Sequence, residues 1–155
     1  MKALTIAALA LIAAFATPTY AQEQPADNMQ ILIEKLKADK KLLVAENMQL
    51  TEKEAKAFWP VYESYQKDLD KINQRLGKAI NEYAANFQSL TDEVADKLVT
   101  EATAIEVDRT KLIQSYLPKL KKVLPVKKVA LYYQLENKIR AVVNFQLAAN
   151  IPLVK

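Results

Sequence analysis

The sequence predicts an all-α fold, an elongated four-helix protein built on a long antiparallel helical hairpin. Apolar residues recur at alternating steps of three and four along two long stretches, as they do on one face of an α-helix. Leu50-Thr51-Glu52-Lys53-Glu54 opens the first stretch and Leu90-Thr91-Asp92-Glu93-Val94 opens the second. No period-two alternation and no hairpin-turn dipeptide indicates a strand. Two helix starts that bracket one uninterrupted helical pattern predict two long helices joined by a turn.

Residues 1–21 have the features of a secretory signal peptide. Met1-Lys2 supplies a positive charge, residues 3–16 are apolar, and Thr19-Tyr20-Ala21 offers the small residues that signal peptidase requires. The alternative is an N-terminal membrane anchor, although this apolar run is shorter than the roughly 20 residues that span a bilayer. We expect cleavage after Ala21, one helical domain over residues 22–155, and a soluble mature chain in the periplasm or outside the cell.

The composition argues against several classes of functional site. The full chain has no cysteine and no histidine, and Gly77 is its single glycine. Disulfides, thiolate and imidazole metal sites and the commonest general base are therefore missing, which leaves carboxylates as the remaining metal ligands. One glycine is too few for a phosphate-binding loop or a nucleophile elbow. We predict no enzyme activity, no cofactor and no metal site, and we expect helix packing to stabilise the fold.

The first helix is predicted to follow a short leader and to end near Glu46. Asp27 or Asn28 can cap its start, and Asn47-Met48-Gln49 is interpreted as the break after it. Its apolar positions are Ile31, Leu32, Leu36, Leu42 and Leu43. Because this segment is short and highly charged, we expect it to pack against the longer helices.

The second helix is predicted to run from Thr51 to Gln88. Thr51 and Glu54 can form a capping box, with Leu50 as the staple residue. At about 1.5 Å per residue the helix would span roughly 55 Å, so we expect an elongated molecule. Pro60 should bend the helix, unless it marks the true helix start. The apolar seam comprises Phe58, Tyr62, Tyr65, Leu69, Ile72, Leu76, Ile80, Tyr83 and Phe87.

The aromatic residues of this seam are interpreted as core rather than as a ligand site. Trp59 differs from them because it is rotated about 100° from Phe58 around the helix. An indole combines an apolar body with a polar N–H, which suits a partner contact near solvent. The alternative is that Trp59 is buried under the first helix.

The third helix is predicted to begin after Leu90 and Thr91, because Asp92 and Glu93 are favoured near the positive end of a helix dipole. We expect Pro118 to kink it. Arg109 lies on the apolar stripe and, with Glu101, interrupts it, so partial solvation is expected in the middle of the helix. The apolar positions are Val94, Leu98, Ala102, Ile105, Leu112, Tyr116 and Leu120.

The fourth helix is predicted from Pro125 to about Ala149, since proline fits a first turn and Asn150 with Pro152 provides a stop. Its apolar positions are Val129, Tyr132, Tyr133, Ile139, Val142, Val143 and Leu147. An apolar tail follows at residues 151–154. We expect the tail to fold back onto the bundle; the alternative is that it meets a partner.

Charge is distributed unevenly along the last two helices. Residues 92–108 contain six acids and one lysine, whereas residues 109–140 contain nine bases and the single acid Glu136. Three interpretations of the basic part compete: a solvated face that pairs with the acidic stretch of a second subunit, a docking patch for acidic protein segments, or a contact with lipid headgroups or nucleic acid. Its densest part is Lys119, Lys121, Lys122, Lys127 and Lys128.

The two helix starts resemble the paired Leu-Thr-x-x-Gln signature of the Spy/CpxP family of periplasmic proteins. The matching residues are Leu50, Thr51, Leu90 and Thr91. Glu54 stands in place of the first glutamine, and Val94 stands in place of the second. The resemblance implies a thin, curved, antiparallel homodimer that holds unfolded or stressed envelope proteins on a concave face without ATP. It also implies an alternative, a relative that restrains an envelope-stress sensor kinase.

We therefore expect an ATP-independent periplasmic chaperone that binds unfolded or stressed envelope proteins. The alternative is a periplasmic accessory protein that modulates an envelope-stress sensor kinase or a similar signalling partner. The predicted partner-binding residues are Trp59, Lys119, Lys121, Lys122, Lys127 and Lys128. We expect no nucleic-acid partner, because removal of Lys2 leaves 21 basic against 18 acidic residues, a net charge of only +3. We also expect no stable membrane insertion once the signal peptide is cleaved.

Overall fold

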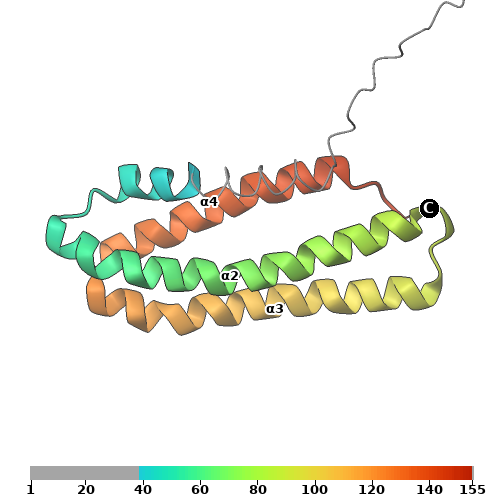
Figure 1. The fold of residues 1–155 in the computed structure, drawn as a ribbon, viewed down its shortest axis with the longest axis horizontal. Helices are drawn as coiled ribbons and strands as arrows, with labels where there is room; N and C mark the ends of the chain where they lie inside the picture. The colour runs from blue at the N-terminus through green and yellow to red at the C-terminus, as the bar shows by residue number, and fades with distance from the viewer. Residues whose placement is uncertain (1–38, 155) are drawn as a thin grey trace, which may run out of the picture. The chain divides into compact units, whose positions relative to one another are not determined.

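The computed structural model describes residues 39–154, which belong to one compact unit, Lys37–Lys155. The predicted signal peptide and the start of the predicted first helix, with Ile31, Leu32 and Leu36, lie outside the described residues. Within residues 39–154 the chain is all-helical and has no strand, which confirms the all-α part of the predicted fold class (Figure 1). The elements are a helical segment at 39–48, α2 (Glu52–Asn86), the 3-10 turn η1 (Phe87–Ser89), α3 (Asp92–Val123) and α4 (Val126–Asn150).

The helical segment at 39–48 ends later than the sequence predicts. It continues through Asn47 and Met48, so the predicted break is wrong for these two residues. The chain turns at Gln49, whose φ of 44° lies in the left-handed region and is incompatible with a further helical turn. The Gln49 carbonyl accepts a hydrogen bond from Lys128 Nζ at 2.9 Å, which holds this turn against α4.

The buried face of this segment also differs from the prediction. Val44 and Met48 expose 0% and 1% of their surface, whereas Leu42 and Leu43 expose 58% and 46%. Residues four apart lie on the same helix face, so Val44 and Met48 meet the core together. The prediction of Leu42 and Leu43 as the packing face is therefore wrong.

Both long helices begin where the sequence predicts. The Thr51 hydroxyl accepts a hydrogen bond from the Glu54 amide at 3.3 Å, and the Thr51 amide donates to Glu54 Oε2 at 2.8 Å, which completes a capping box. At the start of α3 the Thr91 hydroxyl accepts from the Val94 amide at 3.3 Å, and valine has no group to return the bond. The side-chain caps explain why the two helices start at Glu52 and Asp92.

Each long helix continues through an internal proline, Pro60 in α2 and Pro118 in α3. The interpretation of Pro60 as a helix start is wrong, because the capped first turn lies eight residues earlier, at Glu52. The Ser64 hydroxyl donates a hydrogen bond to the Pro60 carbonyl at 2.9 Å. The bends predicted at the two prolines stay predictions.

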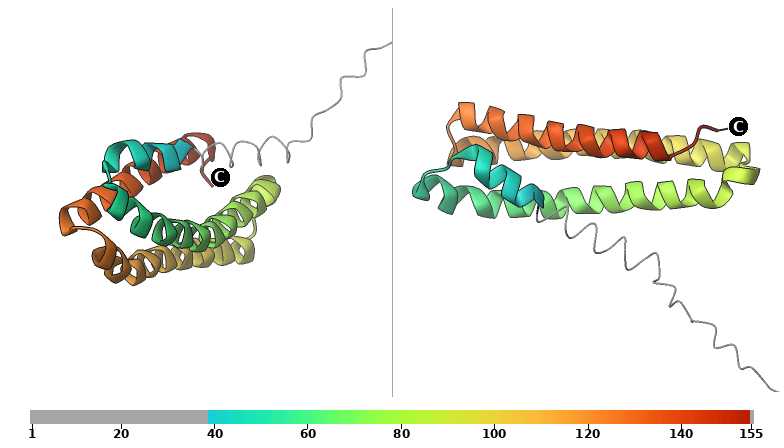
Figure 2. Two further views of the ribbon diagram at one scale, coloured as in Figure 1. Left: turned by 60° about the vertical axis from the view of Figure 1, so that its left-hand side comes forward. Right: turned by 90° about the horizontal axis from the view of Figure 1, so that it is seen from above.

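α2 contacts α3 on one side and α4 on the other (Figures 1 and 2). Its contacts with α3 follow in reversed order along the chain. From the start of α2 these pairs are Asp68–Tyr116 at 2.8 Å, Arg75–Asp108 at 2.6 Å and Glu82–Lys97 at 2.6 Å. Its contacts with α4 and the tail follow in the same order. These pairs are Phe58–Tyr132, with ring centroids 5.3 Å apart, Gln66–Glu136 at 2.8 Å and Tyr83–Pro152 at 2.9 Å.

The core is concentrated at the end of the unit where α3 turns into α4. Aromatic rings dominate it: Tyr132 packs edge-on against Phe58, Tyr62 and Tyr65 with centroids 5.3 to 6.2 Å apart. The buried cluster comprises Val44, Met48, Phe58, Tyr62, Tyr65, Leu69, Tyr116, Leu120, Leu124, Val129 and Tyr132. We call residues 39–69 and 112–136 the closed half, and residues 70–111 and 137–154 the open half. Within the open half only Ile72 and Ile105 are buried apolar residues.

The predicted seams are therefore only half correct. The α2 seam is buried from Phe58 to Ile72, as predicted, but Leu76, Ile80, Tyr83 and Phe87 are only half-buried. On α3 the prediction for Ala102 is wrong, since this residue is exposed. On α4 it is wrong for Tyr133, Val142 and Val143, which expose 45%, 64% and 39% of their surface. Periodicity marks a face of a helix, but whether the face is covered depends on a partner helix.

α4 ends at Asn150, as its Asn-x-Pro stop predicts. The tail returns toward α2, where the Tyr83 hydroxyl donates a hydrogen bond to the Pro152 carbonyl at 2.9 Å. Leu153 and Val154 nevertheless expose 88% and 66% of their surface. Ile151 is half-buried, so the predicted cover of the tail is found for Ile151 and is missing for Leu153 and Val154 within the described residues.

Candidate partner-binding surface

The open half leaves large apolar side chains in contact with solvent. On α4, Val142 and Phe145 expose 64% and 72% of their surface, and the tail adds Leu153 and Val154. On α3, Val99 exposes 64%. Residues 141–154 contain no charged side chain. Of the exposed large apolar residues, those in the open half are Val99, Val107, Val142, Val143, Phe145, Leu153 and Val154. Exposed apolar surface is typical of a surface that contacts another molecule.

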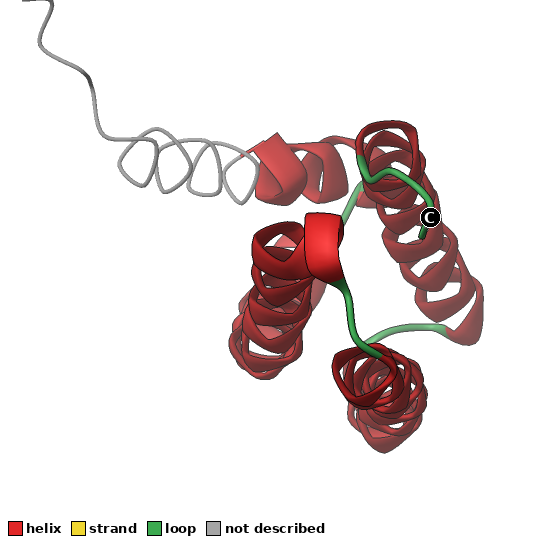
Figure 3. Cartoon of the chain, turned by 90° about the vertical axis from the view of Figure 1, so that its right-hand side faces the viewer, coloured by secondary structure: helices red, strands yellow, loops and turns green. Residues whose placement is uncertain are grey.

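One face of α4 loses its cover along the length of the helix. Residues on this face, three or four positions apart, are fully buried at Tyr132, 8% exposed at Glu136, half-buried at Ile139 and 39% exposed at Val143. The end view shows α4 at one corner of the arrangement, apart from α2 and α3 (Figure 3). The apolar seam of the three helices thus passes from core to surface without a change in residue type.

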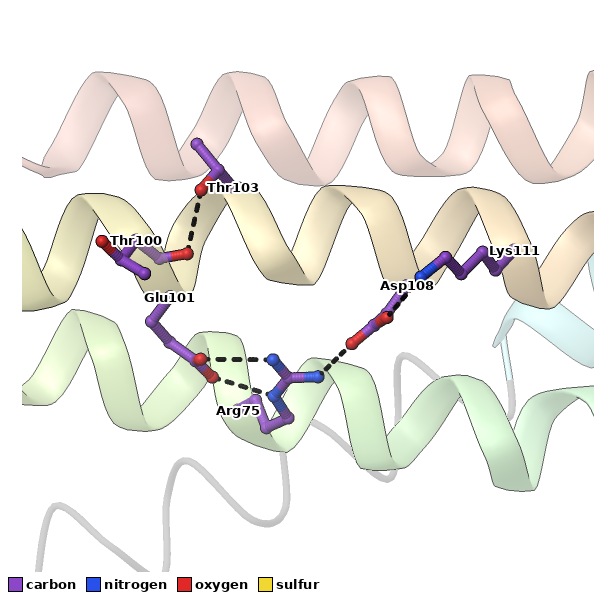
Figure 4. A network of polar contacts seen from close by, with 6 residues as sticks. All are labelled: Arg75, Thr100, Glu101, Thr103, Asp108 and Lys111. Carbon is purple, nitrogen blue, oxygen red and sulfur yellow. Dashed lines mark hydrogen bonds and ion pairs between the residues drawn. The ribbon is translucent and has the colours of Figure 1, made fainter.

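In the open half, where Ile72 and Ile105 are the buried apolar residues, ion pairs also join α2 to α3 (Figure 4). Arg75 Nε and Nη2 donate to the two oxygens of Glu101 at 2.8 and 3.2 Å, and Arg75 Nη1 donates to Asp108 at 2.6 Å. Lys111 lies 4.0 Å from the other oxygen of Asp108. This fork-shaped pairing orients both partners, which an exposed lysine pair does not do.

The arginine changes the titration of its partners. Its hydrogen bond holds the pKa of Glu101 below the ordinary value, and it does the same to the pKa of Asp108. The two carboxylates in turn raise the pKa of Arg75. All three groups therefore stay charged at neutral pH, and the contact between α2 and α3 depends on those charges.

A buried polar cluster lies at the border between the two halves. Lys40 Nζ donates to Glu136 Oε2 at 2.7 Å and to Gln66 Oε1 at 2.9 Å, and Gln66 Nε2 donates to Glu136 Oε1 at 2.8 Å. Gln66 Nε2 also reaches the Tyr132 hydroxyl at 3.3 Å. Burial, followed by the negative charge of Glu136, raises the pKa of Tyr132 well above its ordinary value. The cluster ties the segment at 39–48 to α2 and α4.

The predicted basic patch separates into free and engaged lysines. Lys121, Lys122 and Lys127 are exposed and have no carboxylate partner among residues 39–154. Lys119 is exposed and its Nζ lies 4.0 Å from the centre of the Tyr116 ring. Lys128 is engaged, since its Nζ contacts Glu54 Oε2 at 2.6 Å and the Gln49 carbonyl at 2.9 Å. At the α3–α4 corner a partner can therefore reach the exposed lysines, namely Lys119, Lys121, Lys122 and Lys127. Lys128 instead stabilises the fold.

Trp59 was predicted either to contact a partner near solvent or to be buried under the first helix, and its position has features of both. It is half-buried and packs edge-on against Phe58 and Tyr62, with ring centroids 5.1 and 5.3 Å away. Lys41 Nζ lies 5.3 Å from the Trp59 ring. One face of the indole therefore belongs to the core, and the segment at 39–48 only partly covers it.

The residues of the two Leu-Thr motifs act in helix capping. Thr51 and Thr91 are exposed caps, while Leu50 and Leu90 are half-buried beside them, and Leu50 packs against the core. Hydrogen bonds from Lys128 and from the Thr51 amide hold the pKa of Glu54 below its ordinary value. These contacts give the motif residues a structural role, and they do not distinguish one protein family from another.

Metal-binding and membrane-spanning features are absent from the part of the chain that the structure describes. Residues 39–154 contain no group of three or more acidic side chains arranged to hold a metal ion. None of the described helices combines the length and the apolar character needed to cross a bilayer.

No protein-family model, curated protein or solved structure matches the chain. The resemblance to the Spy/CpxP family stays an expectation, and function has to be argued from the surface itself.

Sequence reasoning missed the residues that join the helices through polar contacts. Arg75 pairs with acids 26 and 33 positions later, and Lys40 pairs with an acid 96 positions later. A charged residue beside an apolar seam is a weak signal for such a pair, because most are solvated. Glu136, the single acid among nine bases, was the one sequence feature that could have pointed to a buried partner.

Proposed function

We propose that the protein is an ATP-independent, chaperone-like protein of the periplasm that binds unfolded or stressed envelope proteins along its open half. The observation that carries this proposal is the exposure of the same apolar seam that forms the core in the closed half. An unfolded segment offers apolar side chains without a fixed geometry, so a shallow apolar surface can hold it through non-directional contacts. The proposal includes no catalytic step.

The proposal also includes the shape and assembly expected from the sequence. The α2–α3 pair would be the long antiparallel hairpin of an elongated molecule, and two chains would associate as an antiparallel homodimer. α2 contains 35 residues, which corresponds to roughly 52 Å of helix. Analytical ultracentrifugation of the mature chain at micromolar concentration tests this part, since a monomer sedimenting as a compact sphere would contradict it.

The chaperone proposal is tested by aggregation assays with a matched pair of variants. Val142 and Val126 lie on the same helix and expose 64% and 66% of their surface, but only Val142 belongs to the open half. We expect Val142→Ser, combined with Phe145→Ser, to weaken the suppression of aggregation of several unrelated denatured proteins. Val126→Ser should retain it. Equal activity of the two variants would contradict the open half as the binding surface.

A second function is favoured by the α3–α4 corner. Lys121, Lys122 and Lys127 are exposed and unpaired among the described residues, so they present positive charge to an acidic partner domain. We propose, as the alternative, that this corner docks a periplasmic sensor domain of a stress-signalling kinase. Charge reversal at Lys121 and Lys122 should change the output of envelope-stress signalling and leave aggregation suppression intact. Unchanged signalling together with weaker aggregation suppression would exclude this function.

A further inference from the structure

Near the border between the two halves, two arginines from α3 and α4 approach the same carboxylate, and a tyrosine of α2 lies within reach of their charges. Tyr65 comes from α2, Arg109 from α3 and Arg140 from α4. Tyr65 exposes 4% of its surface, and the Arg109 side chain exposes 12%. Arg140 is more open, with 43% of its side chain exposed. Tyr65 and Arg109 are thus largely buried, whereas Arg140 on α4 is partly exposed to solvent.

The charges of both arginines reach the Tyr65 hydroxyl. Burial and the negative charge of Glu136 raise the pKa of Tyr65, and the charges of Arg109 and Arg140 act against that rise. Among the described residues the Tyr65 hydroxyl has no hydrogen-bond partner, so its O–H is free to donate. Glu136 itself already accepts from Lys40 and Gln66.

The two arginines lack the carboxylates that such groups usually find. Arg75 has two acids of its own, with contacts of 2.6 to 3.2 Å. Arg109 and Arg140 instead share the single carboxylate of Glu106, at 3.8 and 3.6 Å, which is too long for a hydrogen bond. Glu106 also exposes 61% of its side chain, so solvent weakens its effect.

The hydrogen bonds of Arg109 indicate more specifically that an acceptor is missing. Its Nη2 donates to the Asn73 side-chain oxygen at 3.1 Å, which is a neutral acceptor. Its Nε is buried and has no acceptor in the part of the chain that the structure describes. Buried donors are almost always paired in native proteins, and an N–H of a charged group is costly to leave unpaired.

We infer that Tyr65, Arg109 and Arg140 form a binding site for an oxoanion, either a phosphate or a carboxylate. Guanidinium groups present planar pairs of donors that match the two oxygens of such an anion, and the tyrosine hydroxyl supplies a further donor. Lys40 neutralises Glu136 at 2.7 Å. The charges of Arg109 and Arg140 are therefore opposed by the single exposed carboxylate of Glu106, which favours an added negative charge. This inference goes beyond the proposed chaperone function, since binding of a small anion requires no unfolded protein.

Two sources can supply this anion. One is free inorganic phosphate, and the other is the carboxylate of a glutamate or aspartate on a polypeptide segment that lies along the open half. Phosphate and a side-chain carboxylate each present two or more oxygens to the guanidinium and tyrosine donors, so the two anions are recognised by the same chemistry. The experiment therefore uses one probe for each source.

The first arm measures the binding of inorganic phosphate to the folded mature chain by isothermal titration calorimetry, with sodium chloride at equal ionic strength as reference. The matched variants are Arg140→Gln and Lys138→Gln, which remove one positive charge each from neighbouring positions of α4. Among residues 39–154, Lys138 is exposed and pairs with no carboxylate. We expect roughly tenfold weaker phosphate binding in Arg140→Gln, as for the loss of a charge-assisted hydrogen bond, and unchanged binding in Lys138→Gln.

Two further variants keep the test decisive if one of them folds poorly. Tyr65→Phe keeps the ring in the core and removes only the hydroxyl, and Arg109→Lys keeps the charge and removes the buried Nε donor. Circular dichroism confirms that each variant is folded before titration. Both should bind phosphate more weakly than the unmodified chain, and unchanged binding in both would overturn the assignment.

The second arm compares two apolar peptides that differ only by glutamate or glutamine. Tighter binding of the glutamate peptide, reversed by phosphate and by Arg140→Gln, assigns the carboxylate of a bound segment as the source. Equal peptide binding together with a phosphate response assigns a free anion. Equal peptide binding together with no response to phosphate beyond that to chloride would overturn the inference.

Discussion

The closed half and the open half are built from the same three long helices, and they differ in what covers the inner faces of those helices. In the closed half the helical segment at 39–48 packs as a fourth helix against the other three. Its Val44 and Met48 are fully buried against the aromatic cluster. In the open half Val143, on the same face of α4 as Tyr132, exposes 39% of its surface, compared with 0% for Tyr132.

The comparison shows that one apolar seam can serve as core or as surface, depending on a short segment beside it. The closed half is held mainly by apolar burial, to which the Lys40–Glu136 and Lys128–Glu54 ion pairs are added. The open half has only Ile72 and Ile105 as buried apolar residues. Ion pairs of Arg75 and Lys97 between α2 and α3, with a hydrogen bond from Tyr83 to the tail, therefore form a larger share of its contacts. The two halves should therefore respond differently to substitution, acid and binding.

The largest difference is expected for removal of a phenylalanine from each half. Phe58→Ala should lower the free energy of unfolding by about 3–5 kcal/mol, because Phe58 is fully buried and its removal leaves a cavity. Phe145→Ala should change it by less than about 0.5 kcal/mol, because Phe145 is 72% exposed. Urea denaturation followed by circular dichroism measures both, and similar losses would contradict the division into halves.

The next largest change in stability is expected for the polar cluster that ties the helical segment at 39–48 to α2 and α4. Lys40→Met should destabilise the fold by roughly 2–4 kcal/mol, since Glu136 would stay buried without a cation. Lys41→Met is the matched control, because Lys41 and Glu63 are 50% and 62% exposed and such pairs contribute little. The double variant Lys40→Met with Glu136→Leu should recover part of the loss. Equal effects of the two single variants, seen by thermal denaturation, would disprove the role of the cluster.

Acid should loosen the open half before the closed half. The pKa values of Glu101 and Asp108 are lowered in the folded state, so their pairs with Arg75 stabilise it at neutral pH. That stability is present above the unfolded-state pKa values, near pH 4, and is lost as the pH falls through the lower folded values. Glu54 and Asp68 in the closed half also have lowered pKa values, but they lie beside the buried core. Amide hydrogen exchange between pH 6 and pH 3 should therefore show earlier loss of protection in residues 70–111 than in residues 52–69. Arg75→Gln should remove this difference, and simultaneous loss in the unmodified chain would argue against it.

The smallest effect is expected at Gly77, in the middle of α2. A Cβ at this position meets no atom within 4 Å, and the backbone is not in a conformation that requires glycine. Gly77→Ala should therefore raise the free energy of unfolding by about 0.5–1 kcal/mol through helix propensity alone. A thermal shift upward with unchanged client binding is expected, and a destabilised protein would show that the backbone there has to move.

The sequence predicted the elements well because their starts and stops are local. Thr51, Thr91 and Asn150 mark boundaries through hydrogen bonds to residues three or four positions away, and such spacing is visible in a single chain. It predicted the buried face of α2 only up to Ile72. Beyond that residue, burial depends on α4, whose apolar residues show no preferred face for periodicity to detect.

The candidate surface was less predictable, because exposure and pairing also depend on which helices lie beside each residue. Trp59 and the corner lysines stand out in sequence because of their residue type, yet Lys128 proves to be engaged with Glu54. The exposed Val142 and Val143 were predicted on the apolar face of the fourth helix, and the exposed Phe145 was not assigned to any face. Arg109 was recognised as an interruption of a stripe, but its unpaired Nε is visible only in three dimensions.

The central idea, that the open half holds unfolded protein, is tested most directly by amide hydrogen exchange of the mature chain with and without an excess of a permanently unfolded client. We predict added protection in residues 137–150 of α4 and in residues 72–86 of α2, and no change in residues 52–69. Protection confined to residues 119–128, or none in any helix, would contradict it.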